Sequence, residues 1–483
     1  MISVINRKTI PLIVGVIGLI ISIVIFLHNS PFLFSKPMVS SPDGYSRLLH
    51  GVILSEYPDF NNYIWPPGNR KILSLAINLN QSSAEIMARV ESWLTVPLTA
   101  VFLSLTVFQL SQSITAALFA PALLLINPIS SYLSLQTLSE NNWVLLSSIS
   151  IYFICQKKQK FWLIGFLFWS FSQTIRYESW YFAPIIIFIF YHLHRHKKAT
   201  LIFFLSSIVF PLYWLFYTKI HTGSYLTYWN EKMFQSAGGP AHIYHHLVPS
   251  FMVWYSQLIN LFTPATLIIF LVSSVAFIRR NNYLFTLGVI IFFSLVAQVY
   301  FGTMEIFPAR YLSLVPFVII CTITVGLSHF KRPYIVLFIL LVVFIVESSL
   351  LPKRLSTITE KPQVPTIEVG NFLRFNAPKT LCNKYLFDPT DHTWAEISVL
   401  YFSQIPHEYF RLSAINQDQA YEIIDNCTFI LDKGFNNILN PAMKVYLPYK
   451  IYESYHFIVA STAKKCNADP CAPQILDSVQ LKE

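Results

Sequence analysis

The chain has 483 residues, of which 54% are hydrophobic and only 12% are charged, and its mean hydropathy is +0.51. Soluble globular proteins carry about 25% charged residues, so the composition excludes that class and indicates a polytopic membrane protein. The formal net charge is +10. The basic residues form short runs between apolar segments, as orientation in a membrane requires, so we expect no nucleic acid partner.

The apolar segments predict a bundle of about eleven transmembrane helices. Basic residues precede the first segment, as in a signal peptide, but no small-residue cleavage site follows before Pro31, so we expect an uncleaved helix. The predicted spans are 11–28, 93–110, 114–127, 140–155, 161–175, 179–193, 199–218, 252–278, 283–301, 311–328 and 333–351.

Lys and Arg in short loops predict the orientation, because they collect on the cytoplasmic side. With all eleven spans counted, the basic runs at 7–8, 157–160, 194–198, 279–280 and 331–332 share one side. We therefore expect a cytoplasmic N-terminus and an outer face that receives everything after Leu351. No retrieval signal is present at Lys482-Glu483, which favours a bacterial inner membrane.

Beyond Pro352 the hydrophobic runs shorten and alternate, which predicts strands at 427–431 and 455–459 and helices at 367–375 and 395–402. The chain is thus expected to comprise a transmembrane domain, 1–351, with a large first outer loop at 29–91. A small outer α/β domain of about 130 residues, 352–483, follows it.

The cysteines agree with an oxidising location for this outer domain. Cys382, Cys427, Cys466 and Cys471 all fall in it, and four cysteines allow three disulfide pairings. We favour Cys466–Cys471 with Cys382–Cys427. A zinc site is less favoured because the sequence has no paired CxxC spacing.

Two carboxylates at the outer face are candidates for chemistry. Asp43 follows Pro42 at the start of a short amphipathic helix, where it either caps the helix or acts as a general base toward an acceptor hydroxyl. Glu140 lies at the outer end of a predicted span. It is either buried against partners with a functional role or extended toward lipid headgroups.

Two arginines also lie on the outer side. Arg176 shares a tight turn with Glu178, and Arg310 follows Pro308 in another outer loop. Each arginine either forms an ion pair that anchors its corner or binds a phosphate, for which the guanidinium has a suitable fork of donors. Their outward position runs against the positive-inside bias and favours an anionic ligand.

These features, taken in order, resemble the GT-C glycosyltransferases, which include the protein O-mannosyltransferases and the lipid A aminoarabinose transferase. The resemblance covers the whole chain, from the first span to the outer domain. It rests on Pro42-Asp43-Gly44-Tyr45, Trp65-Pro66-Pro67-Gly68, Thr137-Leu138-Ser139-Glu140, Arg176-Tyr177-Glu178-Ser179-Trp180 and Pro308-Ala309-Arg310-Tyr311.

The resemblance implies a GT-C-like helical membrane enzyme that moves a sugar from a polyprenyl phosphate to a lipid, glycan or protein acceptor, with inversion. It implies that Asp43 is the base and Glu140 a supporting acid. Substrate contacts, including those to the lipid phosphate, are expected from Arg176, Glu178, Arg310, Tyr45, Arg47 and Trp65. Many members carry a second acid where Gly44 stands, so we expect no metal or other cofactor.

Two other functions fit many of the same features. A transporter or flippase of a lipid-linked saccharide would also need outward arginines and many spans. It is less expected because the charges lie at the outer edge rather than at mid-membrane, and because no internal repeat is visible. The third possibility is an inactive family member that serves as a scaffold.

Overall fold

A computed structural model describes residues 10–29, 42–56, 66–80, 84–134, 136–225, 257–278, 312–358 and 369–375 and the strands 385–387, 410–412, 428–432, 449–453 and 457–461. The chain divides into two compact units. The first comprises Met1–Ser35 with His50–Glu360, and the second comprises Lys36–Leu49 with Lys361–Glu483.

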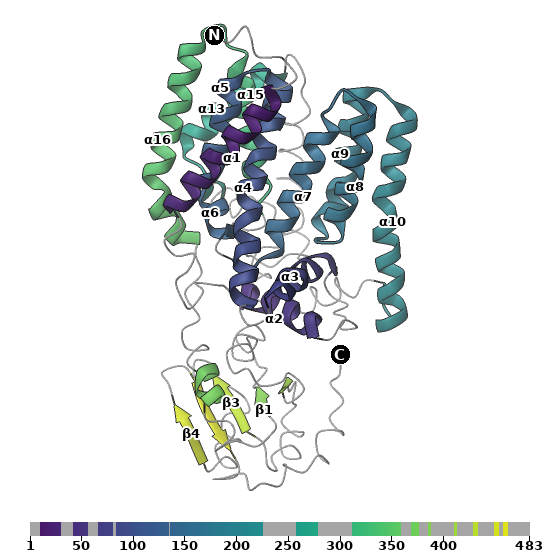
Figure 1. The fold of residues 1–483 in the computed structure, drawn as a ribbon, viewed down its shortest axis with the longest axis vertical. Coiled ribbons are helices and arrows are strands. Elements are labelled where there is room, and N and C mark those ends of the chain that lie inside the picture. The colour runs from purple at the N-terminus through teal and green to yellow at the C-terminus, as the bar shows by residue number, and fades with distance from the viewer. Residues whose placement is uncertain are drawn as a thin grey trace, which may run out of the picture. The chain divides into compact units, whose positions relative to one another are not determined.

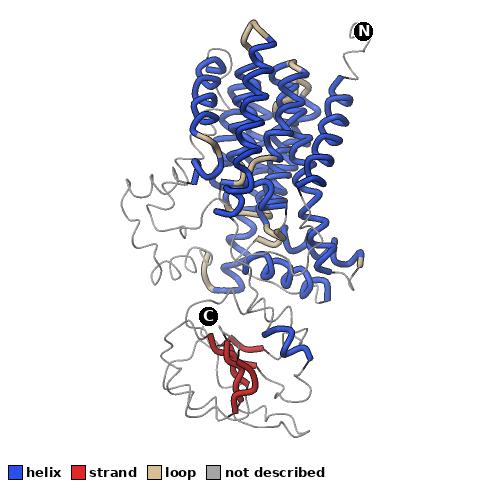
Figure 2. Tube along the Cα trace, turned by 90° about the vertical axis from the view of Figure 1, so that its left-hand side faces the viewer, coloured by secondary structure: helices blue, strands red, loops and turns tan. Residues whose placement is uncertain are grey.

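The first unit is a bundle of helices that run beside one another (Figures 1 and 2). Helices occupy every predicted span in whole or in part except 283–301, which lies outside the described residues. The helices are α1 (Ile10–Asn29), α2 (Pro42–Glu56, shared with the second unit), α3 (Gly68–Leu79), α4 (Ala84–Ser111), α5 (Ile114–Leu125), α6 (Pro128–Ser134), α7 (Ser139–Ile154), α8 (Gln159–Gln173), α9 (Glu178–His194), α10 (Lys197–Thr222), α13 (Pro264–Ile278), α15 (Val315–Ser328) and α16 (Pro333–Ile358).

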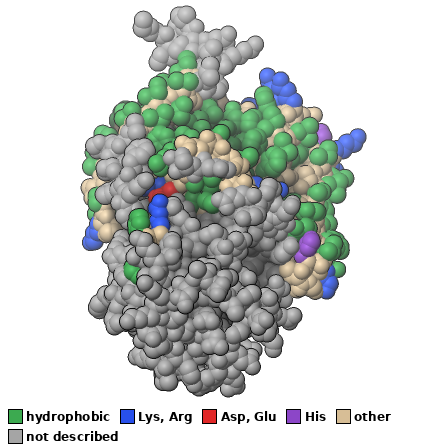
Figure 3. Space-filling model, turned by 60° about the horizontal axis from the view of Figure 1, so that its bottom comes forward, with side chains coloured by type: hydrophobic (Ala, Val, Ile, Leu, Met, Phe, Trp, Pro, Cys, Tyr) green, Lys and Arg blue, Asp and Glu red, His purple; other side chains and the backbone are tan. Residues whose placement is uncertain are grey.

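The protein is an integral membrane protein. Among the described residues, α4, α10 and most of α16 are long and apolar enough to cross a membrane, and α5 with α6 forms a further such segment bent by 62°. Many large apolar side chains of α10 and α16 are exposed, and hydrophobic side chains cover much of the described surface in Figure 3. An apolar exterior is what lipid contact requires. The number of eleven spans stays a prediction.

Helix packing in the bundle depends on small residues, which let helices approach closely in a membrane. Helix α4 packs against α1, α5 and α7. Its Ser104 donates a hydrogen bond to the Ala117 carbonyl of α5 at 2.6 Å. Helices α13 and α15 meet at Gly326, where an added Cβ would lie only 2.4 Å from the Ser273 carbonyl oxygen.

The turns between α7 and α10 separate the charges to opposite ends of these helices. The basic α7–α8 and α9–α10 turns meet at one end, where His194 Nε2 lies 2.7 Å from the Ile154 carbonyl oxygen and the His194 ring packs on Trp162. The turns that lead into α7 and α9, with Glu140 and Arg176, lie at the other ends of those helices. Which of the two ends faces the cytoplasm stays a prediction from the basic runs.

The second unit contains a five-stranded sheet with strand order β2-β1-β3-β5-β4. Strand β1 pairs in parallel with β2 and β3, whereas β5 pairs antiparallel with β3 and β4. The predicted strands at 427–431 and 455–459 correspond to β3 and β5, and residues 369–375 are helical. The strands are β1 (Tyr385–Phe387), β2 (Phe410–Leu412), β3 (Thr428–Asp432), β4 (Tyr449–Glu453) and β5 (Phe457–Ser461).

Two sequence expectations bear on the boundaries of these units. The predicted disulfides lie outside the described residues, within which Cys155 and Cys321 are free. Helix α16 continues to Ile358, beyond the Leu351 expected as its end. The helix continues through Pro352 and the charged residues 353–354. A change from apolar to charged residues ends the apolar run but does not by itself end a helix.

Candidate active site

Helix α7 places Glu140 in its first turn, where the free backbone N–H groups and the helix dipole stabilise a negative charge. The side chain is only 2% exposed, and the neighbouring Ser139, Asn141 and Asn142 are buried as well. This burial excludes a carboxylate extended toward lipid headgroups. Glu140 therefore belongs to an internal polar cluster.

Arg176, in the turn between α8 and α9, is the centre of that cluster. Its Nη1 lies 2.7 Å from Glu140 Oε1 and donates to Ser139 Oγ at 3.0 Å. Its Nε donates to Glu178 Oε2 at 3.0 Å, and its Nη2 donates to the other oxygen of Glu178. One guanidinium thus joins two buried carboxylates, one from α7 and one from α9.

This geometry bears on the two interpretations of Arg176. The ion pair with Glu178, expected as the anchor of a tight corner, is present, and a second ion pair with Glu140 accompanies it. Donors on three nitrogens of Arg176 are committed to these contacts, so a phosphate would have to compete with them. The phosphate role of Arg176 stays a prediction.

The turn that precedes α3 packs directly on this corner. Gly68 N–H donates to the Thr174 carbonyl at 2.7 Å. The next residue, Asn69, is buried and accepts a hydrogen bond from Asn142 Nδ2 at 3.0 Å. The first outer loop, the start of α7 and the α8–α9 turn, far apart in the sequence, therefore meet at one place.

Gly68 is required by this contact, and Gly68→Ala is expected to destabilise the protein by about 1–3 kcal/mol. An added Cβ would lie 2.6 Å from the Thr174 carbonyl oxygen, which is backbone and cannot rotate away. Chemical denaturation in mixed micelles measures the change. Gly15→Ala is the matched control, because its Cβ would meet Leu105 at an ordinary 3.5 Å. Equal stability of both variants would contradict the close approach.

Tyr177 and Ser179 complete the corner. Trp214 Nε1 of α10 donates to Tyr177 Oη at 2.9 Å, and Trp143 Nε1 of α7 donates to Ser179 Oγ at 2.7 Å. Burial raises the pKa of the Tyr177 phenol well above its usual value, and the positive charge of Arg70 offsets part of this rise. Tyr177 therefore stays protonated and contributes packing and hydrogen bonding.

Sequence reasoning missed Glu91 as a member of this region. Glu91 is hydrogen-bonded to Asn142 and accepts a hydrogen bond from Ser92 Oγ at 3.2 Å. Residues 84–91 are expected in the first outer loop, and the structure shows that they form the first turns of α4, which begins at Ala84. The available signal was the polar run Glu140-Asn141-Asn142 at the start of an otherwise apolar span, which needs polar partners in the interior.

Comparison with known structures shows the same fold over nearly the whole chain. ArnT from Cupriavidus metallidurans in the apo state is 11% identical and superposes with a TM-score of 0.61, over 93% of this chain and 98% of ArnT. ArnT bound to undecaprenyl phosphate gives the same TM-score and identity over 95% and 99% of the two chains. The protein has the GT-C fold. AglB, an archaeal oligosaccharyltransferase from Archaeoglobus fulgidus in complex with an inhibitory peptide and a dolichol-phosphate, is 13% identical, with a TM-score of 0.50 over 91% of this chain and 71% of AglB.

At the level of sequence, no family profile and no curated protein matches this chain. The GT-C fold is therefore visible in the arrangement of the helices while the residues have diverged to 11–13% identity with these structures. Individual residue roles have to be argued from this chain itself.

The structure places the remaining predicted site residues as follows. Asp43 lies in the first turn of α2, as expected from Pro42 before it. Tyr45 and Arg47 lie on the same part of α2, which belongs to the second unit. Trp65 and Arg310 lie outside the described residues. Of the predicted residues, the structure brings together Glu140, Arg176 and Glu178.

The fit of a metal ion can be tested on the two carboxylates of the cluster. Within the part of the chain that the structure describes, no group of three or more His, Cys, Asp and Glu side chains could hold a metal. Glu140 and Glu178 share the Arg176 guanidinium, which already supplies the positive charge between them. This pair of carboxylates does not fit a divalent cation.

Proposed function

We propose that the protein is a membrane glycosyltransferase that moves a sugar from a polyprenyl-phosphate donor to an acceptor on the outer face of the membrane. The observation that carries the proposal is the likeness over nearly the full length of ArnT, which was solved with undecaprenyl phosphate bound. The structure of AglB with a dolichol-phosphate and a peptide supports a donor and an acceptor of the same general kind.

In the proposed mechanism, Asp43 takes the proton from the acceptor hydroxyl. The resulting oxygen nucleophile attacks the anomeric carbon, the bond from that carbon to the phosphate oxygen breaks, and the configuration inverts. The leaving lipid phosphate gains negative charge, which cations already in place stabilise without reorganisation. The donor bond is itself activated, so the reaction needs no nucleotide or other cofactor.

Glu140 is proposed to support the reaction as a carboxylate held in a fixed position. The transition state places partial positive charge on the sugar ring, which a nearby negative charge stabilises. The ion pair with Arg176, which also binds Glu178, holds the Glu140 carboxylate in place for that role. We therefore assign Arg176 to holding the two carboxylates; it also stays, with Arg310, a candidate for binding the lipid phosphate. Arg47 and Glu178 are proposed to contact the substrate. Tyr45 and Trp65 are proposed to contact the sugar.

The proposed topology places the N-terminus in the cytoplasm and residues 352–483 outside, in a bacterial inner membrane. The separation of the basic turns from Glu140 and Arg176 along α7–α10 supports it. In this arrangement the transmembrane domain, 1–351, carries the chemistry. The soluble domain contributes the sheet described above, as part of an α/β fold.

The test is a transfer assay with the full chain in membranes and a panel of radiolabelled polyprenyl-phosphate sugars, hexoses and pentoses included, with total cell-envelope acceptors. We expect label to move to an acceptor for at least one sugar, with release of the polyprenyl phosphate. Membranes without the protein serve as the control. Absence of transfer, with labelled lipid changing leaflet instead, would overturn the proposal in favour of the flippase.

A further inference from the structure

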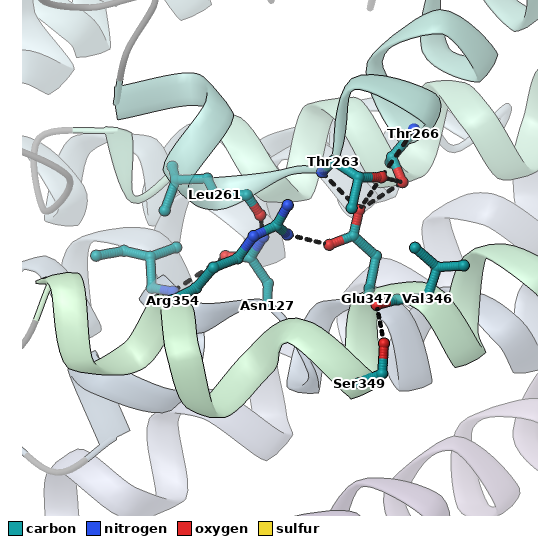
Figure 4. A network of polar contacts seen from close by, with 9 residues as sticks. Asn127, Leu261, Thr263, Thr266, Val346, Glu347, Ser349 and Arg354 are labelled. Atoms are coloured by element: carbon teal, nitrogen blue, oxygen red, sulfur yellow. Dashed lines mark hydrogen bonds and ion pairs between the residues drawn. The ribbon is translucent and has the colours of Figure 1, made fainter.

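A second buried polar cluster joins the start of α13 to α16 (Figure 4). Its centre is Glu347 of α16, which is only 6% exposed. One carboxylate oxygen accepts from the Thr263 N–H at 2.8 Å and from the Thr263 hydroxyl at 2.9 Å, and it also accepts from the Thr266 hydroxyl. The other oxygen accepts from Arg354, two turns further along the same face of α16.

These contacts hold the start of α13. Thr263 directly precedes the helix, and its Oγ1 accepts from the Thr266 N–H at 3.1 Å, as an N-cap does. The first N–H groups of a helix have no partner within the helix, and a negative charge beside them is favourable. Glu347, on a neighbouring helix, therefore helps to cap the N-terminus of α13.

The same segment is tied to α6. The Leu261 carbonyl, two residues before Thr263, accepts from Asn127 Nδ2 at 3.0 Å. The other atom of that amide, Asn127 Oδ1, accepts from the Ile129 N–H at 3.1 Å and thereby caps α6. Helix α6 also packs against α16. The N-terminus of α6 is thus bound, through Asn127, to the Leu261–Thr263 segment that Glu347 contacts.

The C-terminus of α6 is connected to the candidate active site. Asn141 Nδ2 donates to the Leu133 carbonyl at 2.9 Å and to the Gln136 carbonyl at 2.8 Å, which joins the end of α6 to the first turn of α7. Asn141 directly follows Glu140. Hydrogen bonds and short chain segments therefore connect Glu347 to Glu140, the residue that pairs with Arg176.

We propose that Glu347 is a positioning residue for the candidate active site. Together with Thr263 and Arg354 it fixes the start of α13, and through Asn127 and α6 it fixes segment 136–140 and the Glu140 carboxylate. The consequence for catalysis rests on the proposed function, whereas the consequence for the position of this segment does not. An ionisable residue buried at membrane depth is costly, which calls for such a role.

Two measurements on the full chain in nanodiscs test this proposal: amide hydrogen exchange over 128–142 and the kcat and KM of sugar transfer. In Glu347→Leu, we expect exchange over 128–142 to rise about tenfold and kcat to fall about tenfold, with a smaller change in the donor KM. Glu347→Gln keeps an oxygen acceptor for Thr263 and is expected to restore both values to within about threefold of wild type.

Ser170→Ala is the matched control, because it also removes a hydrogen bond between helices, from Ser170 Oγ to the Ser206 carbonyl at 3.0 Å. It should change neither measurement. If Glu347→Leu does not fold, Thr263→Val takes its place. It removes the contacts of the Thr263 hydroxyl with Glu347 and with Thr266, and we expect a smaller change in the same direction. Unchanged exchange over 128–142 in the folded variant would overturn the proposal. Absence of transfer by the wild type would overturn the proposed function. The hydrogen-exchange result would still decide whether Glu347 positions segment 136–140.

Discussion

Asp43→Asn is expected to lower the rate of sugar transfer by about 10²- to 10⁴-fold, the usual contribution of a general base. Asparagine has nearly the shape of aspartate but cannot take up the acceptor proton at neutral pH. In the first turn of α2 the change removes only the favourable interaction of a negative charge with the helix dipole, about 0.3–1 kcal/mol, so a residue that only stabilises α2 would tolerate it. The substitution therefore separates the two interpretations of Asp43.

The measurement is transfer under single-turnover conditions at equal amounts of folded protein. Glu56→Gln is the control, since Glu56 is the other acid of α2 and ends the helix that Asp43 begins. We expect Glu56→Gln to retain full activity. Transfer by Asp43→Asn within about threefold of wild type would be incompatible with a general base. That result would mean either that Asp43 only stabilises the start of α2 or that the whole protein serves as a scaffold.

The second large effect is expected at Arg176. Arg176→Met should lower the free energy of unfolding by about 3–5 kcal/mol, because it leaves two buried carboxylates without their positive partner. Glu140 and Glu178 are only 2% and 5% exposed, so water cannot replace the guanidinium. Activity should fall as well, since the position of Glu140 depends on this contact.

Chemical denaturation in mixed micelles measures the loss of stability. Arg332→Met is the matched control, because Arg332 is an exposed arginine in the turn between α15 and α16 and should change stability by less than about 0.5 kcal/mol. Arg176→Lys should give an intermediate loss, since the charge remains but the fork that binds Glu178 through two nitrogens does not. A loss below about 1 kcal/mol in Arg176→Met would show that the two carboxylates do not depend on the guanidinium.

Much of the architecture was predictable because it depends on local properties of the chain. Mean hydropathy, the length of apolar runs and the position of basic turns identify a membrane bundle, and the alternation near 428–432 and 457–461 identifies strands. Helix boundaries were less predictable. Helix α4 begins at Ala84, well before the apolar run that starts at residue 93, and its early residues Ala88, Arg89 and Ser92 are buried in the bundle.

The candidate active site was predictable only as residue types near one face of the membrane. The sequence by itself determined that Glu140, Arg176 and Glu178 lie at the ends of apolar segments on a common side. It could not distinguish a charge that faces lipid headgroups from one that is buried, because both follow an apolar run equally well. The tertiary structure decided that Arg176 contacts Glu140 and Ser139, that Gly68 contacts Thr174, and that Glu347 caps α13. Each of these pairs joins segments distant in the chain, and only the packing of the helices sets which of them meet.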